Sequence, residues 1–320
     1  MLDIFLTVDV EIWCDGWHNI DEKFPGAFRK YIYGPTPMGD FGLPHKIKVL
    51  KQHGLTGVFF VESLFSTRFG NQPLAEIVGL LNDGLQEVQL HLHTEWADES
   101  RQPIFEHVRE KRQHLRYFSL EEQTQLIALG TRLISNAGAE EVNAFRAGSF
   151  AFNADTLTAL ATNHIPFDGS YNASMSGPDS GVMPGVTLVE PIECRGVYEY
   201  PMTVFRDGTR SLRHAQLTAC SYKELERLMW QALETGRSSF VLLSHSFELM
   251  NTAMNRPDEV VVKRFGRLCA FLEKNADCFR VRGFQGLTPV VKQSQPAPLN
   301  SPPWVTGLRM IEQAYRRKYQ

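Results

Sequence analysis

The chain has 320 residues, 43% of them hydrophobic and 22% charged, with a formal net charge of -3. These proportions are those of a globular protein and exclude a chain that is disordered throughout. The small negative charge gives no overall positive field, which argues against a protein that binds nucleic acid.

In chain order, apolar runs alternate with amphipathic stretches, the pattern of a parallel α/β fold. Strands are predicted at residues 4–10, 56–61, 87–91, 142–145, 239–243 and 278–281, with a weaker one at 186–191. Helices are predicted at residues 43–53, 74–83, 120–137, 154–163, 223–235 and 259–275. Two of these helices begin with a Ser-x-x-Glu capping box, at Ser119 and at Ser221.

Two segments interrupt this alternation. Residues 12–40 form a long connection rich in aromatic side chains, which either stack on sugar rings or anchor the connection itself. Residues 293–303 hold four prolines and indicate a linker between a domain at 1–292 and a helix at 304–320. That helix docks on the domain or contacts a partner or a membrane surface.

The cysteines are scattered and include no Cys-x-x-Cys pair, so we expect reduced thiols. The first residues lack a basic region and a long apolar run, and no stretch is apolar enough to span a membrane. We therefore expect a cytoplasmic protein without a secretory signal or a transmembrane segment. The oligomeric state is left open.

Two carboxylates, Asp9 and Glu11, follow the first predicted strand in the run LTVDVE. Their i, i+2 spacing points both side chains to the same side of the strand, and active sites of α/β folds lie at the carboxyl ends of strands. Two close acids repel unless a cation neutralises them. The pair is therefore a candidate for one metal ligand and one general base, although two acids can also simply cap a turn.

Three potential metal ligands, His91, His93 and Glu95, follow the third predicted strand in the run EVQLHLHTEW. Neutral imidazoles bind zinc and similar ions, and a carboxylate can complete the ligand set. A single histidine after a strand is usually structural. Three ligands within five residues favour a metal site.

Arg146 and His245 stand at the ends of two further predicted strands, in the runs FRAGSF and LLSHSF. An arginine can hold a carboxylate through two hydrogen bonds, and a histidine can donate a proton to a leaving amine. Each residue alone has a structural interpretation. Because the carboxyl ends of parallel strands meet at one edge, the four strand ends together predict one active site.

On these motifs the chain resembles the polysaccharide deacetylase family, the NodB-homology carbohydrate esterases, over roughly residues 2–284, in a variant with an Asp-x-Glu first motif. The resemblance implies a distorted (β/α) barrel with fewer than eight strands and a divalent metal, usually zinc. It implies Asp9 as the base, Glu11 as a metal ligand, His245 as the acid and Arg146 as the group that orients the base. Trp13, Trp96 and Asp168 are then expected to bind substrate, with Asp168 close to the arginine or the base.

The ligand motif departs from the family pattern, which has two histidines at i, i+4, because Glu95 stands four residues after His91. Spacing favours Glu95 as the next ligand, whereas ligand chemistry favours His93, and both remain candidates. A shell rich in carboxylate would also suit Mn²⁺ or Mg²⁺.

The resemblance implies a hydrolase that removes an N-acyl group, acetyl or formyl, from an amino sugar. The expected cytoplasmic location favours a nucleotide- or lipid-linked precursor of a polysaccharide or lipopolysaccharide. Two alternatives remain: a hydrolase of a non-sugar amide, and a carbohydrate-binding protein whose deacetylase site is degraded.

Overall fold

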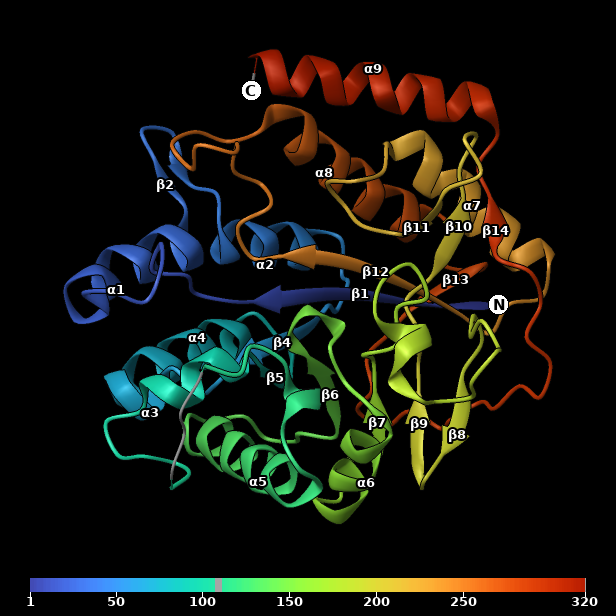
Figure 1. Cartoon of the computed structure of the whole chain (residues 1–320). Helices are drawn as coiled ribbons and strands as arrows, with labels where there is room; N and C mark the ends of the chain where they lie inside the picture. Colours follow the sequence, from blue (N-terminus) through green and yellow to red (C-terminus); the bar gives the residue numbers. More distant parts are fainter. Residues whose placement is uncertain (107–110, 320) are drawn as a thin grey trace. The chain divides into compact units, whose positions relative to one another are not determined.

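The computed structural model describes residues 1–106 and 111–319. Its contacts divide the chain into two compact units (Figure 1). Unit 1 comprises Met1–Gly57, Thr203–Arg282 and Ala297–Gln320, and unit 2 comprises Val58–Met202 and Gly283–Pro296. Residues 107–110 of the predicted domain, and the last residue of the predicted helix 304–320, lie outside the described residues.

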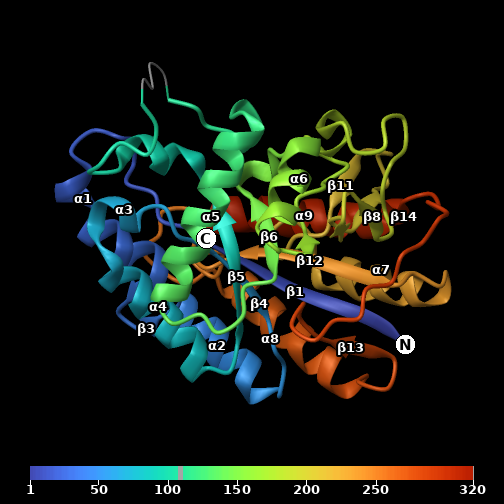
Figure 2. The ribbon, with the colours of Figure 1, turned by 90° about the horizontal axis from the view of Figure 1, so that it is seen from below.

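Unit 1 is built on a parallel sheet in which β1 (Leu2–Val10) lies between β12 (Ser239–His245) and β13 (Phe279–Val281). All nine residues of β1 are buried, as expected for a strand covered on both faces. Figure 2 shows β1 and β12 side by side. Their register pairs Asp9 with His245, so the two strands end at the same level.

The predicted helices of unit 1 are confirmed, with boundaries shifted by at most one residue. The helices are α2 (Leu43–Gln52), α7 (Tyr222–Glu234), α8 (Glu259–Lys274) and α9 (Pro303–Tyr319). A second, small sheet holds β10 (Val204–Arg206), β11 (Leu212–His214) and β14 (Leu299–Asn300).

The aromatic connection at 12–40 is more ordered than the sequence predicts. It contains α1 (Ile20–Phe28), a π-helical turn (Arg29–Tyr33) and a hairpin of β2 (Pro35–Thr36) and β3 (Gly39–Asp40). The ring of Phe28 lies 6.0 Å from that of Phe24 and 6.2 Å from that of Tyr33. Several of the aromatic side chains therefore hold this segment together.

Unit 2 holds a run of parallel strands with helices between them. The strands are β4 (Val58–Glu62), β5 (Glu87–Leu92), β6 (Ala144–Ala147), β7 (Phe167–Asp168) and β9 (Val197–Glu199), with β8 (Ile192–Cys194) antiparallel to β9. The helices are α3 (Ser66–Phe69), α4 (Asn71–Asp83), α5 (Leu120–Asn136) and α6 (Ala154–Thr162). Short 3-10 turns cover Thr94–Glu99, Leu115–Tyr117, Gly148–Phe150 and Gly177–Ser180.

The predicted strand at 186–191 is wrong, because side chains take the backbone N–H groups that a neighbouring strand would need. Tyr171 Oη accepts from the N–H of Leu188, and Gln295 Oε1 accepts from those of Val189 and Glu190. The chain enters a strand only at β8. Local apolar composition could not reveal these two distant side chains.

All five cysteines are free of disulfides, as expected. No helix in residues 1–106 and 111–319 is long and apolar enough to cross a bilayer.

Candidate active site

Unit 1 brings together Asp9, Glu11 and His245, three of the residues predicted from the sequence. One ligand atom from each lies within 4.8 Å of the others. Asp9 occupies the carboxyl end of β1 beside His245 on β12, and Glu11 follows on the same side of the chain two residues later. Two carboxylates and an imidazole at this spacing could hold a divalent cation.

His245 is fixed by carboxylates on both sides of its ring. Its Nδ1 lies 2.8 Å from Oε1 of Glu248, and its Nε2 lies 3.9 Å from Oε1 of Glu11. Burial alone would lower the pKa of the imidazole, but the hydrogen bond to Glu248 and the charges of Glu11, Glu248 and Asp9 outweigh it and raise the pKa to about 9. In the metal-free protein the imidazole is therefore protonated at neutral pH and can donate a proton.

Glu248 and Lys46 are buried ionisable residues that the sequence analysis missed. Burial would raise the pKa of Glu248, yet the hydrogen bond from His245 holds it below its usual value. Gln216 Nε2 also donates to this carboxylate. Lys46 Nζ donates to Ser244 Oγ at 3.2 Å, and burial lowers the lysine pKa to about 8.

Trp13, predicted to bind substrate, contacts Glu11. Its indole Nε1 donates to Oε2 of Glu11 at 2.9 Å, and its ring packs edge-on against Trp17 at 6.3 Å. The structure thus gives Trp13 a role in orienting the carboxylate. Stacking on a sugar stays a prediction for this residue.

In unit 2, His91 is oriented by a backbone carbonyl. Its Nδ1 lies 2.8 Å from the carbonyl oxygen of Arg146 on the neighbouring strand β6. A carbonyl can only accept, so Nδ1 is the donor, and in the neutral imidazole Nε2 is the nitrogen with the lone pair. This tautomer is the one in which Nε2 can bind a metal.

His93 and Glu95 are neighbours of His91. The rings of His91 and His93 are 4.9 Å apart, and Nδ1 of His93 lies 3.4 Å from Oε2 of Glu95. All three side chains are buried. The structure therefore places the two histidines ring to ring, with Glu95 against the second of them.

Glu62, at the end of β4, fixes the backbone around these histidines. It pairs with His91 in the sheet register, and its carboxyl group accepts the N–H groups of Leu64 and His93. Burial raises the pKa of Glu62 to about 8. The side chain can therefore hold this turn at neutral pH largely without a negative charge.

Gly148, directly after β6, lets the imidazole of His93 approach the backbone. A Cβ at this position would lie 2.7 Å from Nδ1 and 2.8 Å from Cγ of His93. The next two residues, Ser149 and Phe150, have φ values of 56° and 55°, a left-handed conformation that is costly for side chains of this kind. The turn after β6 therefore has a strained backbone and lies directly against the imidazole of His93.

Arg146 is buried within unit 2. Its guanidinium lies 4.4 Å from the ring centre of Phe60, and its Nε donates to the carbonyl of Gly169 at 3.0 Å. A planar guanidinium stacked in this way has a fixed orientation. The arrangement suits a group that positions another residue.

Asp168 pairs with Glu199, which the sequence analysis did not identify. The two are register partners on β7 and β9; Ser170 donates to Asp168 at 2.6 Å, and the Tyr171 N–H donates to Glu199 at 3.0 Å. Burial raises the pKa of both carboxyl groups, and the charge of Asp168 raises that of Glu199 further. The positive charge of Arg146 acts in the opposite direction and lowers the pKa of both groups.

Trp96, also predicted to bind substrate, is 1% exposed and packs edge-on against Phe65 and Phe69. In this structure its ring stabilises the turn Thr94–Glu99 and is covered by protein.

Three of the unpredicted residues had local signals in the sequence. Glu62 directly follows the predicted strand 56–61, Glu248 lies three residues after His245, and Glu199 follows an apolar-aromatic alternation. Lys46 sits within a helical pattern and gave no such signal.

No protein-family model and no curated protein matches the chain. Among solved structures, a protein from Mycobacterium smegmatis described as a polysaccharide deacetylase matches 92% of this chain and 94% of its own, at 16% identity and a TM-score of 0.55. A family 4 carbohydrate esterase from Streptomyces lividans with bound acetate matches 91% of this chain and 97% of its own, at 12% identity and a TM-score of 0.40. A family 4 pseudoenzyme from Bacillus anthracis matches 93% of this chain and 68% of its own, at 12% and 0.44.

At these identities the likeness to the Mycobacterium protein shows the fold and no more. The predicted fold class, an α/β fold of the distorted (β/α) barrel, NodB-homology type, is confirmed. The predicted number of strands, fewer than eight, is wrong: in the described residues three strands of unit 1 (β1, β12, β13) and six of unit 2 (β4 to β9) belong to sheets of this type. The chain therefore has the fold of the polysaccharide deacetylases, which is the family that its motifs resemble.

Proposed function

We propose that the protein is a metal-dependent hydrolase that removes an N-acyl group from an amino sugar. The observation that carries the proposal is the grouping of Asp9, Glu11 and His245, with Nδ1 of His245 2.8 Å from Oε1 of Glu248. A carboxylate and an oriented imidazole are thereby held at the ends of adjacent strands. The deacetylase fold favours the same chemistry.

The two proton-transfer roles follow from this group. Asp9 takes a proton from the attacking water, whose oxygen forms a bond to the acyl carbon as the carbon–nitrogen bond breaks. His245 gives its proton to the departing amine, and the products are a free amino group and a carboxylic acid. Arg146 is the proposed group that orients the base.

The donor set fits a divalent cation, because it consists of carboxylates and of imidazoles with a defined tautomer. We propose Glu11, His91 and His93 as ligands, with Glu95 orienting His93 through the 3.4 Å contact at Nδ1. Such an ion, when bound, polarises the acyl carbonyl. Zinc suits the imidazoles, and manganese or magnesium would suit a shell with more carboxylate.

The proposed substrate is an N-acetylated or N-formylated amino sugar, in the form of a nucleotide- or lipid-linked precursor inside the cell. Trp13 is the proposed substrate-contacting residue that is not already assigned to the chemistry. Asp168 and Trp96, 0% and 1% exposed, retain this proposed role only if the chain around them rearranges.

The test is release of acetate or formate from N-acyl amino sugars by the metal-loaded protein and its variants. Asp9→Asn is expected to lower kcat by about a hundredfold or more while metal content stays at the wild-type level. Asp277→Asn, at an exposed residue, is the matched control and should retain activity. Full activity of Asp9→Asn would contradict its role as base. A metal-loaded wild type that binds N-acyl sugars without turnover would instead support a carbohydrate-binding protein.

A further inference from the structure

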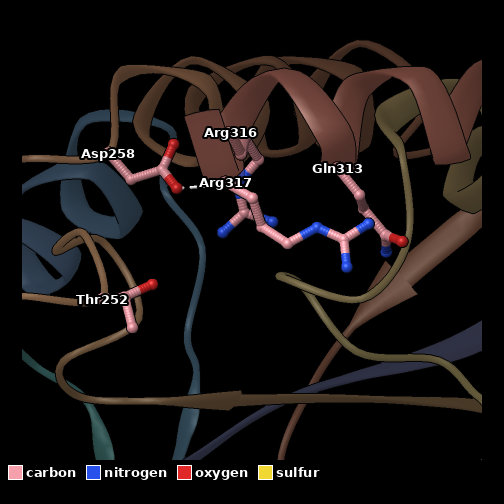
Figure 3. A pocket seen from close by; sticks show the side chains of 5 residues that line it. All are labelled: Thr252, Asp258, Gln313, Arg316 and Arg317. Carbon is pink, nitrogen blue, oxygen red and sulfur yellow. Dashed lines mark hydrogen bonds and ion pairs between the residues drawn. The ribbon is translucent and has the colours of Figure 1, made fainter. Parts of the chain in front are cut away.

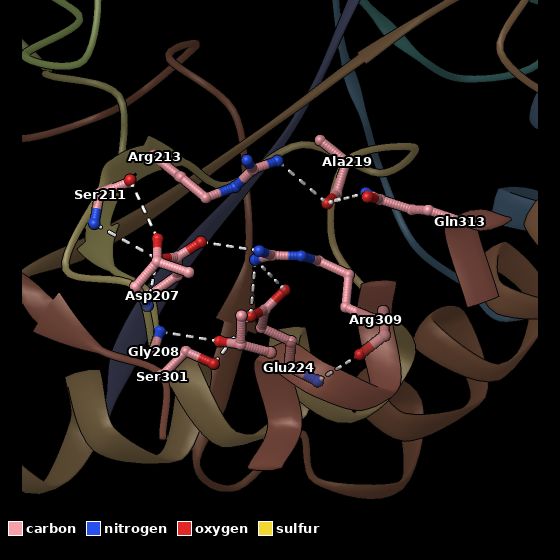
Figure 4. A network of polar contacts seen from close by, with 12 residues as sticks. Asp207, Gly208, Ser211, Arg213, Ala219, Glu224, Ser301, Arg309 and Gln313 are labelled. Atoms are coloured by element: carbon pink, nitrogen blue, oxygen red, sulfur yellow. Dashed lines mark hydrogen bonds and ion pairs between the residues drawn. The ribbon is translucent and has the colours of Figure 1, made fainter. Parts of the chain in front are cut away.

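Helix α9 is attached to the rest of unit 1 mainly through charged groups. Figure 4 shows Arg309 reaching from α9 to Glu224 on α7 and to Asp207 beyond β10. The guanidinium lies 3.0 Å from Glu224 and 2.7 Å from Asp207, and all three side chains are almost fully buried. Ser301 donates a further hydrogen bond to Glu224.

The face of α9 that contacts the rest of unit 1 is polar along its whole length. Arg316 pairs with Asp258 at 2.7 Å, Glu312 pairs with Arg264, and Gln313 donates to a backbone carbonyl at 3.0 Å. A hollow of about 240 Å³ at the C-terminal end of this face is lined by polar side chains, as Figure 3 shows: Thr252, Asp258, Gln313, Arg316 and Arg317. Only Val305 is a fully buried aliphatic residue of α9.

The opposite face of α9 is apolar and exposed. Five side chains at helical spacing, i, i+4, i+7, i+11 and i+15, form what we call the apolar stripe: Trp304, Leu308, Ile311, Tyr315 and Tyr319. Each is at least half exposed, as is Met310 on the flank. Among the described residues, no other helix carries more than one exposed large hydrophobic side chain.

This arrangement reverses the usual polarity of a surface helix, in which the apolar side faces the core. Exposed apolar side chains grouped on one element mark a surface that contacts a partner or a membrane. Ion pairs attach α9 to the protein, and the stripe is presented outward.

The charges beside the stripe favour an anionic surface. The single carboxylate of α9, Glu312, pairs with Arg264, and Arg309 and Arg316 are neutralised by carboxylates of unit 1. Lys318 is exposed at the C-terminal end, with its Nζ 5.1 Å from the ring centre of Tyr319, whereas Arg317 lines the hollow on the other face. Tryptophan, tyrosine and lysine are the side chains that favour the lipid headgroup region.

A second copy of the chain fits this face less well. Two α9 helices pairing through their stripes would need opposite charges at the flanking positions, and α9 offers cations there but no unpaired carboxylate. In a parallel pair the basic ends would also repel each other.

We propose that α9 binds the surface of an anionic lipid membrane, lying in the plane of the headgroups. The apolar stripe inserts among the upper acyl chains, and Lys318 contacts lipid phosphates. The ion pairs of Arg309 and Arg316 keep the helix attached to unit 1 in this state. The proposal does not depend on the proposed hydrolase activity.

The test is co-sedimentation of the full chain with phosphatidylcholine vesicles that contain or lack phosphatidylglycerol. The wild type is expected to bind the anionic vesicles, and less strongly as salt rises. Ile311→Ser should weaken partitioning by about tenfold or more, since it removes an exposed aliphatic side chain that the proposal buries among the acyl chains. Lys318→Gln should weaken it by about fivefold, because a cation near such a surface contributes about that factor.

Val290→Ser is the matched control, an exposed valine far from α9 in sequence, and it should bind as the wild type does. All variants change exposed side chains, and circular dichroism and the Tm would verify that they fold. No binding of the wild type to anionic vesicles, or binding that Ile311→Ser leaves unchanged, would overturn the proposal. A dimer in sedimentation velocity that Ile311→Ser dissociates, without vesicle binding, would assign the stripe to a second copy.

Discussion

The carboxylate of Glu248 lies 2.8 Å from Nδ1 of His245 and makes this imidazole a cation at neutral pH in the metal-free protein. Because the hydrogen bond fixes Nδ1 as a donor, the ring presents Nε2 toward Glu11. One residue outside the predicted motifs thus orients the proposed acid and, together with the charges of Glu11 and Asp9, raises its pKa.

Glu248→Gln should lower the pKa of His245. The amide keeps the size of the side chain but removes the negative charge that favours the imidazolium. NMR titration of the metal-free protein is expected to give a His245 pKa near 9 in the wild type and at least about one unit lower in the variant. Glu259→Gln, at an exposed helix position, should leave the titration unchanged. Identical titrations of wild type and Glu248→Gln would contradict the assigned cause.

The stability of the metal-free protein should depend on pH through His245. Its folded-state pKa of about 9 lies above the ordinary 6.5, so the protonated ring contributes stability that is fully present below pH 6.5. That contribution is lost as the pH rises through 9 and is on the order of 3 kcal/mol. Lys46, with a folded pKa of about 8, acts in the opposite direction between pH 8 and 10.5.

The difference in unfolding free energy between the wild type and His245→Gln isolates this contribution, because Lys46 is common to both proteins. Denaturant titrations at pH 6, 7.5 and 9.5 should show that the free energy of unfolding of the wild type exceeds that of His245→Gln by less as the pH rises. A constant difference across this range would rule out the linkage.

Metal content should distinguish His93 from Glu95. We expect His91→Ala and His93→Ala to lose the metal, whereas Glu95→Gln should keep it with an affinity lowered by about 10- to 100-fold, as for a residue that orients a ligand. Metal analysis of the purified variants, followed by a chelator competition, measures both effects. Loss of metal in Glu95→Gln with retention in His93→Ala would reverse the assignment.

Gly148→Ala should displace the ring of His93. The added methyl would lie 2.7–2.8 Å from three ring atoms, so the imidazole or the turn must move. We expect a loss of stability of about 1–3 kcal/mol and a weaker affinity for the metal. Gly79→Ala in α4, where a Cβ meets nothing within 4 Å, should be neutral or stabilising. Equal behaviour of the two variants would show that the contact at Gly148 is unimportant.

Arg309→Ala should destabilise unit 1 by about 3–5 kcal/mol, because it leaves Glu224 and Asp207 buried without their cation. Lys263→Ala, which removes an exposed i, i+4 pair with Glu259, should cost less than about 0.5 kcal/mol. Urea unfolding of both variants provides the comparison. A small effect of Arg309→Ala would mean that packing, rather than the ion pairs, attaches α9.

The strand ends could be predicted from the sequence because each apolar run ends directly in its polar residues. This placed Asp9, Glu11 and His245, and the register of β1 with β12 then brought them together. The same reasoning found His91 and Arg146 on adjacent strands. Local patterns were sufficient here because the carboxyl ends of neighbouring parallel strands lie at the same edge of a sheet. Residues at those ends therefore come close together without any other feature of the fold.

What the sequence could not show depends on pairs that meet only in the folded chain. The carboxyl pair of Asp168 and Glu199 needs the register of β7 with β9, and the irregular segment before β8 depends on Gln295. The reciprocal capping box predicted at Ser221 also fails, because the carboxylate of Glu224 is bound by Arg309. The box at Ser119 is confirmed, because Glu122 still accepts from the Ser119 N–H at 2.8 Å although Arg112 also donates to its carboxylate.

The sheet of unit 1 joins β1 to a strand roughly 240 residues further along the chain. During synthesis β1 therefore leaves the ribosome well before β12 exists, and at ordinary translation rates it waits on the order of 10 to 50 seconds for its neighbour. Throughout that interval a strand whose nine residues are all buried in the finished protein is without its partner. Chaperone binding to residues 2–10 of the nascent chain, released once β12 has emerged, is the expected way for the cell to keep this segment from aggregating.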